Sequence, residues 1–226
     1  MFKNLVTSAL IAGFVAGLIA AALQISMLVP VLLEAELYET GVLRHFGAET
    51  REQHNFEIAH DWARNGFTIL AMVAIYIGFA LMMVAALAFA ESKGVVVTAR
   101  RGILWGLGGF AAIQLFPSIG LAPELPGMLA AEVIPRQIWW ASTVIATIIG
   151  LSAIVFGKNW THWGIGLVVL AVPHIVGAPH PAIFGGTVPP ELAAEFAGLS
   201  LGVGAISWAC LGLLSAYFWL KQTQST

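Results

Sequence analysis

Charged residues are scarce in this chain. Only 10% of its 226 residues are Asp, Glu, Lys or Arg, whereas 59% are hydrophobic, and the mean hydropathy is +0.88. A typical soluble domain carries about 25% charged residues. The composition therefore predicts an integral membrane protein with membrane lipid as its surroundings.

Cysteine is almost absent too. Cys210 is the only one, which excludes an intramolecular disulfide and any cysteine-based zinc or iron-sulfur cage.

The formal net charge is -2 and no Lys or Arg cluster occurs, so nucleic acid is not an expected partner. The sequence also lacks the phosphate-binding G-x-x-x-x-G-K-[ST] and His-Glu-x-x-His motifs, and shows no recognisable Ser-His-Asp or Cys-His arrangement. We therefore do not expect an enzyme.

Long uncharged windows separate the few charges. About 20 apolar residues are enough for a helix to cross the hydrocarbon core of a membrane. The expected fold is therefore an all-α integral membrane protein of about six transmembrane helices, forming one multi-pass domain over residues 1–226. The predicted spans are 4–33, 65–90, 102–123, 137–157, 159–178 and 196–220, with an outer loop at 34–64. A re-entrant fifth segment, which would make the number of crossings odd, is the alternative.

The fifth window is interrupted near its end. Three prolines and a glycine in the segment 173–181 (Pro-His-Ile-Val-Gly-Ala-Pro-His-Pro) prevent a regular helix from continuing, and the segment holds His174 and His180. Irregular backbone at membrane depth is tolerated where it lines a cavity or is buried in protein, so it often marks a place where a polar substrate is handled. Alternatively, the two imidazoles cap backbone carbonyls that the prolines leave without a donor.

Basic residues near the span ends indicate the orientation. With both termini in the cytoplasm, six basic residues lie inside and four outside. The inner ones are Lys3, Lys93, Arg100, Arg101, Lys158 and Lys221, and the outer ones are Arg44, Arg51, Arg64 and Arg136. In this topology every carboxylate except that of Glu91 faces outward, and so does every histidine except His162. Such an outer face would concentrate cations.

Histidine and carboxylate together suit first-row divalent metals, because imidazole nitrogen and carboxylate oxygen are both ligands for them. In helical register Glu57 would lie beside His60 and Asp61, with His54 three residues earlier. The alternative for this stretch is a solvated helix in which Arg64 neutralises Asp61. The candidate metal-binding residues are His45, His54, His60, His174, His180, Glu34, Glu36, Glu57 and Asp61.

Glycines four residues apart predict two close helix contacts. Gly13 and Gly17 form such a pair in the first span, and Gly198 and Gly202 form one in the last. Small residues allow two helix backbones to approach closely within a membrane. These pairs describe packing and carry no chemistry.

Six stretches spread over almost the whole chain resemble the CbtA-type family of predicted cobalt transporter subunits. They are Val29-Pro30 followed by Glu34 to Glu39, His54 to Gly66, Pro123 to Gly127, Arg136 to Trp140, Pro173 to Pro181 and Val188 to Leu192. The resemblance implies a multi-pass subunit of a cobalt uptake system linked to cobalamin synthesis. It also implies a partner, a small one-span membrane protein with a histidine-rich segment.

We therefore expect a membrane subunit that moves a divalent metal ion, Co²⁺, inward, with no tightly bound cofactor. The acidic and histidine-bearing outer face would feed ions to the proline-broken histidine segment. The alternative is a scaffold that transports nothing, for example a subunit that holds a haem. An enzyme acting on membrane lipids or quinones is the weakest of the three possibilities, because no acid/base cluster lies within the spans.

Overall fold

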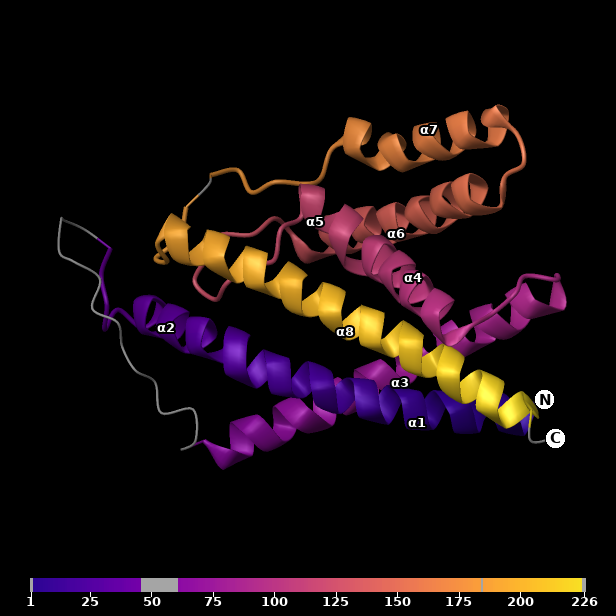
Figure 1. The fold of residues 1–226 in the computed structure, drawn as a ribbon. Coiled ribbons are helices and arrows are strands. Elements are labelled where there is room, and N and C mark those ends of the chain that lie inside the picture. Colours follow the sequence, from indigo (N-terminus) through magenta and orange to yellow (C-terminus); the bar gives the residue numbers. More distant parts are fainter. Residues whose placement is uncertain (1, 46–60, 184, 225–226) are drawn as a thin grey trace. The chain divides into compact units, whose positions relative to one another are not determined.

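The structure, a computed structural model, describes residues 2–45, 61–183 and 185–224. These residues form helices and no strand, apart from one isolated β-bridge between Met128 and Gly186 (Figure 1). The predicted all-α class is confirmed. The helices are α1 (Phe2–Leu23), η1 (Gln24–Leu28), α2 (Val29–Glu39), α3 (Trp62–Ser92), α4 (Ala99–Phe110), η3 (Ala111–Leu115), α5 (Phe116–Gly120), α6 (Val133–Phe156), α7 (Trp160–Val176) and α8 (Pro190–Gln224); η1 and η3 are single π-helical turns.

Five helical runs in the described part of the chain are long and apolar enough to cross a membrane. They are Phe2–Glu39, Trp62–Ser92, Ala99–Gly120, Val133–Phe156 and Pro190–Gln224, and the 17-residue α7 is a shorter apolar helix. Each of the six predicted windows thus contains one helical run. The first run continues past the predicted end at residue 33, so Glu34, Glu36 and Glu39 lie on α2 and not in a loop.

The chain forms two compact units, which we describe separately. Unit 1 consists of Met1–Pro30, Phe56–Phe110 and Gly202–Thr226. Within it α1 packs against α3 through the glycine pair expected from the sequence. A Cβ atom on Gly17 would lie 2.6 Å from Cα of Val73, and one on Gly13 would lie 2.5 Å from Cα of Ile77. The predicted close contact of the first span is confirmed.

A second close contact in unit 1 joins α4 to the C-terminal part of α8. A Cβ atom on Gly212 would lie 2.5 Å from the backbone nitrogen of Gly106, and the ring of Trp208 covers Gly109. The predicted contact at Gly198 and Gly202 is wrong, because no atom lies within 4 Å of a Cβ built on either residue. Spacing alone could not distinguish the glycine of α8 that packs, Gly212, from the two that do not.

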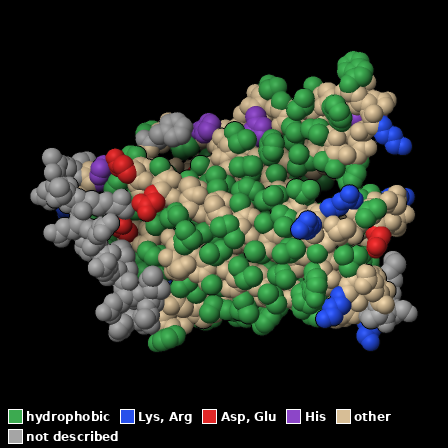
Figure 2. Space-filling view, viewed as in Figure 1, with side chains coloured by type: hydrophobic (Ala, Val, Ile, Leu, Met, Phe, Trp, Pro, Cys, Tyr) green, Lys and Arg blue, Asp and Glu red, His purple; other side chains and the backbone are tan. Residues whose placement is uncertain are grey.

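Both chain ends lie at the same end of unit 1. Asn4 Nδ2 donates to the carbonyl oxygen of Gln222 at 3.1 Å, and Ser8 Oγ donates to that of Phe218 at 3.1 Å, so α1 and α8 are antiparallel. The indole of Trp219 donates to Glu91 Oε2 at 2.8 Å, which brings the end of α3 to the same place. Lys and Arg side chains gather at this end (Figure 2). The basic residues on the helix ends that meet here are Lys3, Lys93, Arg100, Arg101 and Lys221.

Unit 2 consists of Val31–Asn55 and Ala111–Leu201. Its centre is the hairpin of α6 and α7, which run side by side (Figure 1). A Cβ on Gly150 would lie 2.6 Å from Cγ of Leu170, so glycine permits this approach. Two loops, 121–132 and 177–189, pair through backbone hydrogen bonds from Leu129 to Gly185 (3.0 Å) and from Thr187 to Gly127 (3.2 Å). The loop that carries His180 is thereby fixed to the loop that precedes α6.

Candidate metal-handling site

Helix α7 passes through Pro173 and ends three residues later. Proline has no N–H and therefore leaves the carbonyl four residues earlier without its usual donor. Gly177 ends the helix with φ 87°, a conformation that favours glycine, and its N–H donates to the carbonyl of Pro173 at 3.0 Å. The predicted break is confirmed and lies at Gly177. His174 is consequently on the last turn of a helix, and the break follows it.

Trp139 of α6 fixes this last turn. Its indole N–H donates to the carbonyl oxygen of Pro173 at 3.1 Å, and the side chain is buried, with 7% of the residue exposed. A Cβ on Gly120, at the end of α5, would lie 2.6 Å from Cη2 of the same indole. The indole therefore sits in a closely fitted place between α5 and α7, and the backbone beside His174 has little freedom to move.

The His174 ring lies between two aromatic rings. Its centroid is 5.8 Å from that of Trp139, which presents edge to face, and 6.1 Å from that of Phe116 at the start of α5. Nε2 of His174 is buried and has no hydrogen-bond partner among the described residues. A buried polar atom without a hydrogen bond lowers the free energy of unfolding by about 1–3 kcal/mol, so its presence requires an explanation. The carbonyl of Pro173 has its donors from Trp139 and Gly177, and Nε2 of His174 is not one of them.

The chemistry available here is that of one imidazole. A neutral imidazole nitrogen is a ligand for a divalent transition metal. Among the residues that the structure describes, no group of three or more His, Cys, Asp or Glu side chains lies close enough to hold a metal ion. Within the described residues His174 therefore stands as a single imidazole and not as part of a ligand cluster.

His180 has a different environment. It lies in the loop after Gly177 and is exposed, whereas His174 is half-buried.

Near the start of α6, Arg136 Nη2 donates to Glu124 Oε2 at 2.6 Å, and each side chain is 28% exposed. This ion pair fixes the preceding loop to the helix that carries Trp139. Glu124 is thus neutralised by an arginine and contributes less negative potential than its sequence position indicated.

The remaining predicted metal ligands are spread along the chain. Glu34 and Glu36 are half-buried on α2, and His45 is exposed beyond its end. Asp61 caps α3, since its Oδ1 accepts the backbone N–H of Arg64 at 2.8 Å and its Oδ2 lies 3.8 Å from Nε of Arg64. Asp61 therefore has a structural role. The predictions for His54, Glu57 and His60 lie outside the described residues.

Several residues of the site were not predicted. The rings of Phe116 and Trp139 lie beside His174, and Gly120 lies against Trp139. Gln114 in η3 and Arg136 also carry a buried side-chain atom without a partner, Oε1 and Nε respectively. A glutamine within an apolar run is a detectable signal. Its significance depends on burial, which the sequence does not show.

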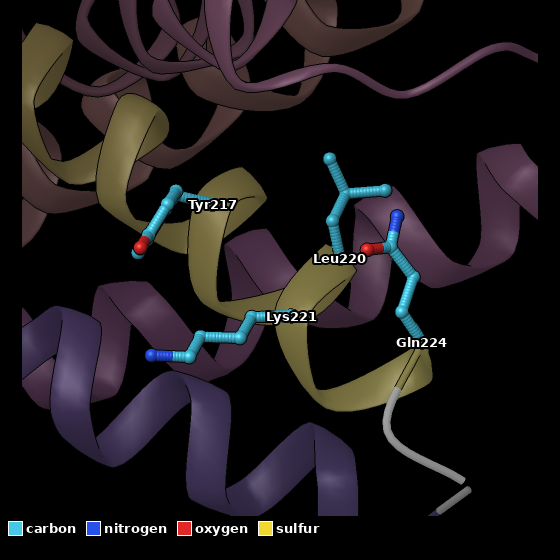
Figure 3. A pocket seen from close by; sticks show the side chains of 4 residues that line it. All are labelled: Tyr217, Leu220, Lys221 and Gln224. Carbon is cyan, nitrogen blue, oxygen red and sulfur yellow. The ribbon is translucent and has the colours of Figure 1, made fainter.

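A surface hollow of 490 Å³ lies in unit 1 at the end of α8. Its lining residues, Tyr217, Leu220, Lys221 and Gln224, all come from the last turns of that one helix (Figure 3). The hollow is open, and none of these four side chains is a carboxylate or an imidazole. It is therefore not a candidate metal site.

Comparisons with known proteins agree with the resemblance found in the sequence. The family model described as "Probable cobalt transporter subunit (CbtA)" matches residues 2–220, nearly the whole chain. No curated protein and no solved structure matches.

Proposed function

The chain belongs to the CbtA family of probable cobalt transporter subunits, and from this premise we propose that it carries Co²⁺ inward through the bacterial inner membrane, past His174. The observation that supports the role of His174 most strongly is its buried Nε2 beside the end of α7, which has no hydrogen-bond partner in the part of the chain that the structure describes. A membrane segment that ends where a polar group is left unpaired is typical of substrate positions in transporters.

A single imidazole suits transport better than a full set of ligands. An ion must bind well enough to enter and weakly enough to leave, so a closed cage would trap it. His174 can replace one water molecule of a hydrated ion and release it again. The general affinity order gives Ni²⁺ and Cu²⁺ an advantage over Co²⁺ at such a ligand, so the geometry of the path or the metal supply must select cobalt.

Acidic and histidine side chains of unit 2 would form the entrance. Glu34 and Glu36 lie on α2, and His180 lies on the loop after α7. The predicted ligands His54, Glu57 and His60 lie outside the described residues. Carboxylates raise the local cation concentration and so speed the arrival of ions. The contact at each residue would be brief.

We assign both termini to the cytoplasm and six crossings to the chain. The start of α1 and the end of α8 lie at one end of unit 1, which supports an even number of crossings in which α7 crosses in addition to the five longer runs. Its 17 residues are at the lower limit for a transmembrane helix. The same end carries Lys3, Lys93 and Lys221, and basic residues favour the cytoplasmic side.

A transporter subunit acts together with other proteins. The resemblance implies a small one-span membrane protein with a histidine-rich segment, and we propose that it delivers the ion to the outer face of this chain. We propose no tightly bound cofactor, with Co²⁺ present as cargo.

The test is cobalt accumulation in a bacterial strain without other cobalt uptake. Strains that express the chain alone, the chain with the small membrane protein, or neither would be given ⁵⁷Co²⁺ at limiting concentration. The proposal predicts accumulation above the empty-vector level when both proteins are present. Equal accumulation in all three strains, with both proteins detected in the membrane, would contradict it.

A further inference from the structure

Three helical runs pass from one compact unit to the other. The passages occur after Pro30 in α2, after Phe110 where α4 meets η3, and after Leu201 within α8. In a membrane protein made of two units, the ease of bending at such passages decides whether the units can change their mutual orientation. Each of the three passages contains a local weakness in the helix.

The first passage combines a π-helical turn with a proline. η1 spans Gln24–Leu28, and Pro30 follows two residues after its end. A π-helical turn widens the helix and interrupts the regular i to i+4 hydrogen bonds, and proline removes one further donor. Ser26 within the turn donates its hydroxyl to the carbonyl of Ala22 at 2.8 Å, a bond that is associated with helix bending.

The second passage repeats this arrangement. η3 spans Ala111–Leu115 and begins at the first residue of unit 2. Pro117 follows two residues after its end, the same spacing as in the first passage. The carbonyl of Ile113, four residues before Pro117, accepts the indole N–H of Trp140 at 3.3 Å in place of a backbone donor. Two of the three passages thus have the same local construction, in different parts of the sequence.

The third passage depends on glycine. α8 is a continuous helix from Pro190 to Gln224, with Gly202 at the first residue of unit 1 and Gly198 one turn earlier. A Cβ on either residue would meet no atom within 4 Å. Packing therefore does not require glycine here, in contrast to Gly102, Gly106 and Gly212. Glycine within a helix lowers its stability relative to alanine, so Gly198 and Gly202 make α8 easier to bend at the place where it passes from one unit to the other.

We propose that Pro30 with η1, Pro117 with η3, and Gly198 with Gly202 are three hinges about which the two units rock during transport. The inference rests on the proposed transport function. Many secondary transporters alternate access by moving one rigid part against another around a substrate position. Hinges placed in all three helical passages allow such a movement without unfolding either unit. The close-packed contacts, α1 with α3 and α6 with α7, each lie within one unit and can stay intact.

Alanine at the α8 hinge provides the test. We expect Gly198→Ala together with Gly202→Ala to stiffen α8 without steric conflict and to slow cobalt uptake by roughly fivefold or more. The thermal stability of the purified protein should be equal or higher. The matched control is Gly78→Ala with Gly108→Ala, because these glycines also meet no atom within 4 Å but lie inside unit 1. The control should transport normally.

A distance measurement separates the hinge from the transport site. Spin labels on Lys93→Cys in unit 1 and Lys158→Cys in unit 2, in a Cys210→Ala background, report the mutual orientation of the units. The hinge predicts a broad distribution of distances that the Gly198/Gly202 variant narrows. If this variant takes up cobalt normally and its distance distribution is unchanged, the hinge proposal is overturned. This holds also when the loss of uptake in His174→Ala supports the transport site. A strain that takes up no cobalt through the unaltered chain would overturn the function, whatever the distances show.

Discussion

The indole N–H of Trp139 donates a hydrogen bond to the carbonyl oxygen of Pro173, with 3.1 Å between nitrogen and oxygen. The next residue, Trp140, makes the equivalent bond to the carbonyl of Ile113, four residues before Pro117. Two consecutive tryptophans of α6 therefore each stabilise a neighbouring helical segment close to a proline. Pro117 has no N–H to give to the Ile113 carbonyl, and Trp140 supplies a donor to that carbonyl. The Pro173 carbonyl already accepts the Gly177 N–H and receives a second donor from Trp139.

Replacement of Trp139 by Phe should lower the stability of the protein and impair cobalt uptake. The change removes the bond to Pro173 and the close fit against Gly120, and we expect a loss of about 1–2 kcal/mol in the free energy of unfolding. Titration with SDS in mixed micelles measures this quantity. Trp140→Phe is the matched control, because it also removes an indole hydrogen bond but from a more exposed residue, and its effect should be smaller. Equal stability losses in the two variants would count against the special position of Trp139.

The helices were predictable because their signal is long and repeated. Each uncharged window contains a helical run, and Gly13 and Gly17 make the contact that their spacing indicated. The end of α2 was not predictable, because Glu34, Glu36 and Glu39 are good helix formers that a hydropathy argument assigns to a loop. The π-helical turns were also missed. Each turn ends two residues before a proline, and the pattern of charge and hydropathy does not indicate a π-helical turn.

Gly17→Ala should destabilise unit 1 strongly. The added methyl group would lie 2.6 Å from Cα of Val73, a backbone atom that cannot move without separating α1 from α3. We expect a loss of about 2 kcal/mol or more in the free energy of unfolding. Gly78→Ala in α3 meets no atom within 4 Å, so it should leave stability unchanged or raise it by up to about 1 kcal/mol. The same SDS titration tests both variants, and indistinguishable midpoints would refute the close packing of α1 on α3.

The candidate site was only partly predictable. Pro173 and Gly177 indicated where the helix is interrupted, and the sequence led directly to His174. Its aromatic surroundings depend on α5 and α6, which lie far away along the chain. Asp61 shows the opposite case. It looked like a metal ligand in a sequence of histidines and carboxylates, but in the structure it caps α3. Side-chain type indicated possible chemistry in both cases, and the metal-ligand role of each residue stays a prediction.

Labelling of single cysteines can test the six crossings. In a Cys210→Ala background, Lys158→Cys lies between α6 and α7, and Ala182→Cys lies in the loop that follows α7. A membrane-impermeant maleimide should label position 182 in cells with a permeable outer membrane, and position 158 only after the inner membrane is opened. Labelling of both positions from outside would show that α7 is re-entrant and that the number of crossings is odd.

The ligand role of His174 can also be tested through proton competition. Imidazole binds metal only in its neutral form, so acidification should weaken Co²⁺ binding to the purified protein. His174→Gln replaces the imidazole nitrogen by an amide, whose carbonyl oxygen does not compete with protons in the same range. The pH dependence of the remaining ⁵⁷Co²⁺ binding should therefore become flatter in this variant. An identical pH profile in both proteins would assign the dependence to other groups.

The most direct test of the account is cobalt uptake by a His174→Ala variant compared with a His162→Ala variant. Both changes remove one imidazole from α7, but His162 is exposed at the opposite end of the helix. With equal amounts of protein in the membrane, we predict that His174→Ala lowers the initial rate of ⁵⁷Co²⁺ accumulation by roughly tenfold or more, whereas His162→Ala has the unaltered rate. An unaltered rate in His174→Ala would contradict the account.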